Sequence, residues 1–215
     1  MEKNTLYNVL AAILIATIVI IACELPVDPD CGPFKDRFMA VDFKTQINRI
    51  TCLDTLHTDI QFMIMDTDTF SFDEFAITMY PVAEYYFSNR HSNRLAFFIS
   101  NVYACSPIHP SSDEVIRDIR IYSDRNFNEG YPAGENLAEM FDVIVLYYSS
   151  LHGYRRYDLR EFLLSEHTVP DEMNFVLTSQ PEYTDRIQFT IEYEMHGLVL
   201  EYYEVTTDPI VLTGI

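Results

Sequence analysis

The densest group of acidic side chains in the sequence lies between residues 66 and 74, and its chemistry suits a hard cation. Asp66, Asp68 and Asp73 lie close together there, and calcium prefers clustered carboxylate oxygens as ligands. An EF-hand loop needs glycine at its sixth position, where this sequence has Ser71. Most acidic clusters are solvent-exposed. We therefore expect a hydrated loop without a bound metal, and the three aspartates are the candidate ligands if calcium binds.

A second segment contains the residue types of a catalytic triad. His109, Ser111, Ser112 and Asp113 are neighbours in the sequence, but a triad is defined by geometry in space. Serine and aspartate after a proline are typical of a turn. The sequence also lacks GxGxxG, GxSxG and HExxH motifs. We therefore expect no enzymatic activity and no cofactor.

Cys23 ends an N-terminal segment that has the composition of an export signal. Lys3 supplies a positive charge, and residues 9–22 are almost entirely apolar. This run is shorter than the roughly 20 residues that a membrane-spanning helix needs, which favours a signal peptide. Ile20-Ile21-Ala22-Cys23 resembles the bacterial lipobox, whose cysteine receives a lipid and becomes the new N-terminus. We predict a lipoprotein signal peptide over residues 1–22 and fatty acyl chains such as palmitate on Cys23, with an uncleaved membrane anchor as the alternative.

The next residues predict a tether, and the remaining cysteines predict a disulfide. Residues 23–34 are rich in proline and acidic side chains, a composition typical of an extended linker. An exported compartment permits disulfides. We expect one bridge among Cys31, Cys52 and Cys105, and their spacing leaves all three pairings open. The leftover thiol is expected to be buried.

Alternation of apolar and polar residues predicts strands along most of the chain. The clearest run spans residues 187–195, and a second run spans residues 198–205. His196 and Gly197 lie between them, which predicts a hairpin whose tight turn uses glycine at positive φ. Further strands are predicted in residues 38–47, 75–79, 95–104, 118–123 and 173–178.

Helical patterns are few. Asp158 precedes residues 159–164, where apolar residues at i, i+3 and i+4 predict a short capped helix. Residues 136–148 predict a short helix that runs into a strand. Many strands joined by short turns favour a mainly β fold, an antiparallel β-sandwich with one or two short helices. We expect a single domain over residues 35–215, with two halves joined near residues 105–114 as the alternative.

Adjacent tyrosines occur in three of these segments: Tyr85-Tyr86, Tyr147-Tyr148 and Tyr202-Tyr203. Neighbouring residues of a strand point to opposite faces of a sheet. One ring of each pair should therefore pack, and the other should be at least partly exposed unless it is covered. We expect most of these rings to serve the core, although an exposed tyrosine on a sheet can also stack on a sugar or anchor a protein partner.

The charge excludes some partners. The formal net charge is −19, with 33 acidic residues against 14 basic ones. Nucleic acids and anionic membrane surfaces are bound through clustered lysine and arginine, so neither is an expected partner. An apolar content of 48% and an aromatic content of 14% also exclude a disordered chain.

One stretch of the sequence resembles a known group of proteins. The resemblance rests on residues 102–107 and 116–128, on Tyr131-Pro132-Ala133-Gly134, and on Leu137 and Phe141. Together they look like a pattern of uncharacterised lipoproteins from Bacteroidetes-type bacteria. The resemblance extends over most of the chain after the signal peptide. It implies a secreted, lipid-anchored domain of unknown function and supplies no catalytic residues.

These patterns together predict a protein of the bacterial cell envelope, anchored by lipid to the outer membrane on its surface or its periplasmic face. We expect a non-enzymatic binding or structural module whose ligand, a glycan or a protein, the sequence leaves open. One alternative is a subunit of a surface or fimbrial assembly. Another is a glycan-acting hydrolase, because such enzymes require only a suitably spaced pair of carboxylates.

Overall fold

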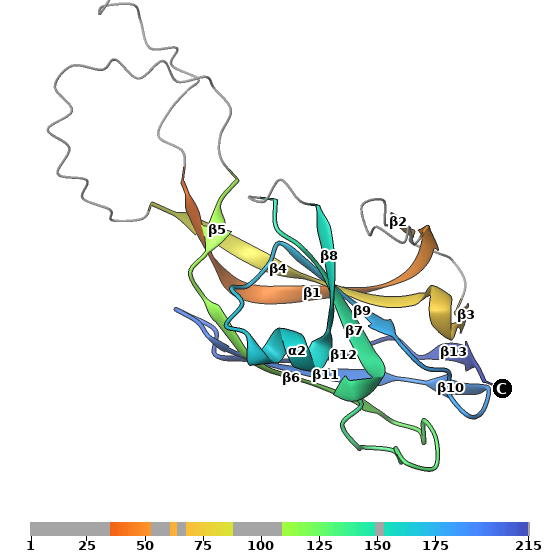
Figure 1. Cartoon of the computed structure of the whole chain (residues 1–215). Coiled ribbons are helices and arrows are strands. Elements are labelled where there is room, and N and C mark those ends of the chain that lie inside the picture. Colours follow the sequence, from red (N-terminus) through yellow and green to blue (C-terminus); the bar gives the residue numbers. More distant parts are fainter. Residues whose placement is uncertain (1–34, 53–60, 64–67, 88–108, 149–152, 215) are drawn as a thin grey trace, which may run out of the picture. The chain divides into compact units, whose positions relative to one another are not determined.

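The computed structural model describes residues 35–52, 61–63, 68–87, 109–148 and 153–214, drawn as a coloured ribbon in Figure 1. They belong to one compact unit of residues 35–88 and 108–215. Most of its strands pair antiparallel, and the sheets pack together, which confirms the predicted mainly β, sandwich-like fold. The single domain over residues 35–215 stays a prediction, because it includes residues outside the described ranges.

The largest sheet crosses the molecule as six consecutive strands with one short addition. Its order is β2 (Gln61–Met63), β1 (Arg37–Cys52), β4 (Phe75–Tyr86), β9 (Glu172–Leu177), β7 (Phe141–Leu146) and β8 (Tyr154–Asp158). The short β5 (Ser111–Ser112) pairs parallel with the start of β1. The edge strands β2 and β8 thus come from distant parts of the sequence.

Two smaller sheets complete the described part. One has the order β12 (Tyr202–Thr206), β11 (Phe189–His196), β6 (Val115–Ser123), and the other β10 (Asp185–Ile187), β13 (Ile210–Thr213), β3 (Thr69–Ser71). β13 and β3 pair in parallel.

The main hydrophobic core lies between the large sheet and β11. Phe75 of β4 stacks on Phe189 of β11 with ring centroids 5.6 Å apart, and Phe43 of β1 lies 4.9 Å from Tyr193. Phe75, Phe189 and Tyr193 are fully buried. Burial raises the pKa of Tyr193 well above its ordinary value. Apolar side chains at alternate positions of each strand thus hold the layers together.

Most of the predicted strands are present. β1, β4 and β6 cover the strands predicted at residues 38–47, 75–79 and 118–123, and β9 covers the strand predicted at 173–178 except for Thr178. The strand predicted at residues 95–104 lies outside the described residues. Residues 187–195 alternate between buried and half-buried as expected, but Gln188 divides them into β10 and β11. The backbone N–H of Gln188 donates to the Asp124 side chain, and the Gln188 side chain donates to the Thr207 carbonyl. Gln188 therefore belongs to neither strand, and the chain passes at this residue from one small sheet to the other.

The predicted hairpin is formed by β11 and β12, but its turn differs from the prediction. Glu194 pairs with Tyr202, and the Met195 N–H donates to the Glu201 carbonyl at 2.9 Å, so the connection is longer than a two-residue turn. Positive φ among the described glycines occurs at Gly134 and Gly153, and Gly197 does not adopt it. Glycine is required at 197 for space, since a Cβ atom there would collide with the Leu200 carbonyl oxygen.

The predicted helix is confirmed as α2 (Leu159–Leu164). The Asp158 carboxylate accepts hydrogen bonds from the backbone N–H groups of Arg160 and Glu161, at 2.9 and 3.0 Å. Asp158 is therefore its N-cap. Leu159 and Phe162 are buried against the core. The helix predicted early in residues 136–148 is a single 3-10 turn, η2 (Ala138–Met140), which leads directly into β7.

Candidate functional site

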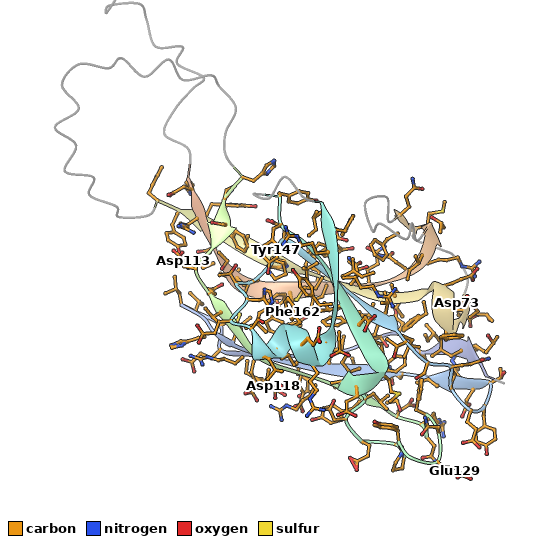
Figure 2. The ribbon with its side chains drawn as sticks, viewed as in Figure 1. Asp73, Asp113, Asp118, Glu129, Tyr147 and Phe162 are labelled. Carbon is orange, nitrogen blue, oxygen red and sulfur yellow. The ribbon has the colours of Figure 1, made fainter. Side chains whose placement is uncertain are left out.

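The structure separates the aspartates that were candidates for metal binding. Asp66 lies outside the described residues. Asp68 precedes β3, where it accepts a hydrogen bond from the Thr69 hydroxyl. Asp73 is exposed in the 3-10 turn η1 (Phe72–Glu74), beside β3 in Figure 2, and accepts from the Ser71 hydroxyl. Asp68 and Asp73 line two different pockets. Within the described ranges, no three His, Cys, Asp or Glu side chains are grouped to hold a metal ion.

The triad-like segment does not form a triad. Ser111 accepts a hydrogen bond from the Arg37 guanidinium, and Arg37 also pairs with Asp113 at 3.0 Å. Ser112 bonds to Glu114. The His109 ring lies instead against the Tyr148 ring, with centroids 5.3 Å apart. These contacts are those of a turn that fastens β5 to β1.

Only one cysteine falls in the described part. Cys52 is the last residue of β1, while Cys23, Cys31 and Cys105 lie outside the described ranges. The disulfide and the lipidation site therefore stay predictions.

Two of the three tyrosine pairs divide as predicted into one packed and one exposed ring. Tyr148 and Tyr202 are 54% and 46% exposed, while Tyr147 and Tyr203 pack against the core. Burial raises the pKa of Tyr147 to about 12, and its hydroxyl donates to the Thr168 carbonyl. In the first pair Tyr85 is the exposed ring.

The outer face of the large sheet is unusual, because its centre is buried although it points away from the core. The strand register places Ala76, Val176 and Asp142 in one row across β4, β9 and β7. Thr78, Asn174 and Ile144 form the next row. Five of these residues are at most 2% exposed: Ala76, Thr78, Ile144, Asn174 and Val176.

Curvature of the sheet explains this burial. The rings of Phe62 in β2 and Tyr154 in β8 meet edge to face, with centroids 5.7 Å apart. A flat sheet would hold these two edge strands about 24 Å apart, because five spacings of roughly 4.8 Å separate them. The sheet therefore curls around its outer face, and Figure 1 shows β2 and β8 on the same side, away from β6 and β11. The two rings cover a small apolar cluster made of Ile50, Ala76, Ile144 and Val176.

A chain of hydrogen bonds crosses this face. The Asn48 amide donates to the Thr78 hydroxyl at 2.6 Å, which donates to Asn174 Oδ1 at 2.5 Å. The Asn174 amide and the Tyr154 hydroxyl both donate to Glu172 Oε1, at 2.8 and 3.1 Å. Burial and the Glu172 carboxylate raise the pKa of Tyr154. We call these five residues the outer polar row.

The outer polar row is almost complete. Asn48 is 5% exposed, and its Oδ1 atom has no hydrogen-bond partner among the described residues. The other side chains of the row satisfy one another, and a fully bonded network holds its members in fixed positions. The outer polar row therefore holds the side chains at the centre of the outer face in fixed positions.

A pocket of about 330 Å³ opens on the outer face beside the apolar cluster. Ile50 and Val176 lie at its floor, and Phe72 supplies an aromatic ring. Its polar lining consists of Asp73, Asp142, Arg156 and Thr178. We call this cavity the outer-face pocket.

Two polar groups of the outer-face pocket hold each other in place. Arg156 Nε donates to Asp142 Oδ2 at 2.6 Å, and both side chains are half-buried. Neighbouring strands β7 and β8 carry them, with Arg156 opposite Ile144 and Asp142 opposite Asp158. One guanidinium donor thus lies beside two carboxylate acceptors and one hydroxyl, over an apolar floor.

The sequence carries weak local signals of this site. Thr78 and Asn174 are polar residues inside runs that are otherwise apolar, which indicates buried polar contacts. Asp142 is likewise a charged residue inside the otherwise apolar β7, and Arg156 is a charged residue between the two tyrosines of Tyr154-Arg155-Arg156-Tyr157. Their convergence depends on pairing between distant strands, which no local pattern shows.

Comparison with known proteins adds no assignment, because no family model, no curated protein and no solved structure matches the chain. Among the residues that the structure describes, no helix has the length and apolar character needed to cross a membrane.

Proposed function

We propose that this protein is a binding module of the bacterial cell envelope that holds an uncharged saccharide in its outer-face pocket. The observation that carries the proposal is the lining of that pocket. Arg156 and Asp142 form a fixed donor and acceptor pair, Thr178 adds a hydroxyl, and Phe72 adds a ring.

The chemistry of the lining selects among ligand classes. A sugar ring presents neighbouring hydroxyls that both donate and accept, together with an apolar C–H face. The Arg156–Asp142 pair suits the hydroxyls, and Phe72 with the Ile50–Val176 floor suits the apolar face. An anionic ligand is disfavoured, since two carboxylates outweigh one guanidinium. The volume of about 330 Å³ lies at the lower end of small-molecule sites, which favours one or two sugar units.

The experiment is a glycan array probed with the purified chain, followed by titration of any glycan that is retained. Arg156→Met should lower the affinity about tenfold or more, because a hydrogen bond to a charged group contributes about 1.5–3 kcal/mol. Arg155→Met is the matched control, since Arg155 is the exposed neighbour on the same strand. Equal loss in both variants, or no retained neutral glycan, would contradict the proposal.

Hydrolysis of the bound glycan is the second candidate, and one observation favours it. Asp73 and Asp142 both line the outer-face pocket, and glycosidases use paired carboxylates. Release of reducing ends from a retained glycan, lost in both Asp73→Asn and Asp142→Asn, would indicate an enzyme. Binding without release would indicate a binding module.

We further propose that acyl chains on Cys23 hold the module at the outer membrane. The support is the sequence of residues 1–23, in which an apolar run ends at a cysteine that resembles that of a lipobox. Two or three acyl chains anchor a protein far better than one. Cells fed a radioactive fatty acid should label the wild-type protein and not Cys23→Ala. Equal incorporation into both would refute the anchor.

A further inference from the structure

The long strand β1 has two edges that are paired very differently. One edge pairs with β4 from Arg37 to Arg49. The other edge pairs with β5 only at Arg37 and Phe38, and with β2 only at Arg49, Ile50 and Cys52. In the described part of the chain, the stretch between these two contacts has no partner strand.

The contacts of Phe43 show which residues in that stretch point their backbone N–H and C=O groups away from β4. Its carbonyl accepts the Tyr203 hydroxyl at 2.7 Å and its N–H donates to Asp42, so neither group is used by β4. Pro81, opposite Phe43, has no N–H to give. Because backbone direction alternates along a strand, Thr45 and Ile47 also point their N–H and C=O groups away from β4.

The outward groups on either side of these two residues are protected. Ala40 N–H donates to the Glu114 carboxylate at 2.6 Å, and Tyr203 occupies the Phe43 carbonyl. At the other end β2 takes over at Arg49. Proteins normally cover exposed strand edges, because an open edge recruits other chains. Among the described residues, the outward backbone groups of Thr45 and Ile47 therefore remain uncovered along this edge.

A groove of about 380 Å³ lies along this opening. Thr45, Gln46 and Ile47 form one wall, and residues 206–210 form the opposite wall. Phe70 and Ile210 are buried at its apolar side. Asp68 and Asp208 are exposed there, and neither has a salt bridge with any described residue. We call it the β1-edge groove.

We propose that the β1-edge groove binds a short extended peptide segment of a partner protein, which adds a strand to β1 and places a lysine or arginine near Asp68 and Asp208. Among the described residues, the backbone groups that Thr45 and Ile47 turn away from β4 have no partner strand, and an extended chain would pair with them. The two carboxylates favour a basic residue. About five residues fill the gap, since Phe43 and Arg49 limit it and a strand rises about 3.3 Å per residue.

The charge of the chain's own tether argues against it as occupant. Residues 23–34 contain three acidic residues and no basic one, and their prolines cannot complete a strand ladder. Repulsion by Asp68 and Asp208 would oppose its docking. A second copy of the chain is the other occupant to be tested.

The test uses three synthetic peptides on the full-length chain in detergent. They are an alternating Val-Lys-Val-Thr-Val-Lys, its counterpart with Glu in place of Lys, and a version of the first with proline at the central valine. We expect binding of the basic peptide, much weaker binding of the acidic one and none of the proline peptide. Bound basic peptide should slow the amide hydrogen exchange of Thr45 and Ile47.

Variants locate the binding to the edge. Thr45→Pro removes an N–H that faces the groove and should weaken the basic peptide about fivefold or more, whereas Thr45→Val keeps the N–H and should retain binding. Asp208→Asn should reduce the difference in affinity between the basic and the acidic peptide. This variant leaves the β1 backbone unchanged, so it tests the proposal even if Thr45→Pro misfolds.

Several outcomes would overturn the proposal: equal binding of all three peptides, unchanged exchange at Thr45 and Ile47, or a dimer that forms through this edge and excludes peptide. Asp208 does not line the outer-face pocket, so saccharide binding should be the same in Asp208→Asn and wild type, and failure of either proposal leaves the other standing.

Discussion

The two faces of the large sheet are built from the same strands and differ sharply in chemistry. On the inner face Ile77 and Phe175 pack among apolar side chains. The residues next to them in each strand, Thr78 and Asn174, turn to the outer face and join the outer polar row. All four are at most 1% exposed. The two faces are therefore buried to the same extent at these positions, and they differ in the kind of side chain that is buried.

The two faces therefore contribute differently: the inner face contributes mainly to the free energy of folding, and the outer face mainly fixes the positions of side chains. The inner layer is apolar and non-directional, which is the usual source of folding free energy. The outer face buries polar groups whose hydrogen bonds fix positions and contribute only about 1 kcal/mol each net. The outer-face pocket opens beside the small apolar cluster of the same face, and Ile50 and Val176 belong to both.

The largest expected effect compares two fully buried isoleucines, one on each face. Ile77→Ala removes inner-core contacts and Ile144→Ala removes contacts of the outer cluster. Both should destabilise the protein by about 2–5 kcal/mol, with Ile144 at the lower end because its cluster is small and can collapse. Urea unfolding of the purified variants measures this. A cost well under 1 kcal/mol for Ile144→Ala would show that the outer face is ordinary surface.

A second prediction tests whether the outer polar row acts as a unit. Asn174→Ala leaves the Thr78 hydroxyl and the Glu172 carboxylate each without one partner, and should cost about 1–3 kcal/mol. Thr78→Val keeps the shape but leaves the Asn48 amide and the Asn174 Oδ1 atom each without that partner, so it should also cost about 1–3 kcal/mol. A double-mutant cycle between them should give a coupling of at least about 0.5 kcal/mol. Additive costs would show that the row is a set of independent contacts.

The same comparison explains how much the sequence predicted. Local chemistry was sufficient for α2, since Asp158 caps it through bonds to residues two and three positions away. Alternation was sufficient for β11, whose inner residues are buried in turn. Both signals lie within one segment and need no knowledge of the partner.

The outer-face pocket could not be predicted in this way. Asp142 and Arg156 meet only because β7 pairs with β8, and the face closes only because Phe62 reaches Tyr154 across four intervening strands. Curvature of a sheet is a property of its whole pairing order. Asp73, by contrast, belongs to an acidic run in the sequence, but the structure places it with Asp142 in a pocket and apart from Asp68.

The smallest expected effect concerns a titrating group at the margin of the inner core. The His167 ring stacks on Phe162 with centroids 4.1 Å apart, and burial lowers its pKa below the ordinary 6.5. The unfolded chain therefore binds a proton more readily than the folded one. Stability should fall as the pH drops from 6.5 toward the lowered folded pKa, and should be fully regained above 6.5.

Replacement of the ring isolates this contribution from other titrating groups. His167→Phe keeps a planar ring on Phe162 and the backbone carbonyl that accepts the Ile116 N–H, but it removes the proton site. The free energy of unfolding of the variant, measured in urea between pH 5 and 8, should depend less on pH than that of the wild type. Asp171 opposes this trend, because burial raises its pKa and favours the protonated folded state. Since Asp171 is present in both proteins, only a difference between the two profiles reports on His167, and parallel profiles would show that the inner core at this margin is insensitive to charge.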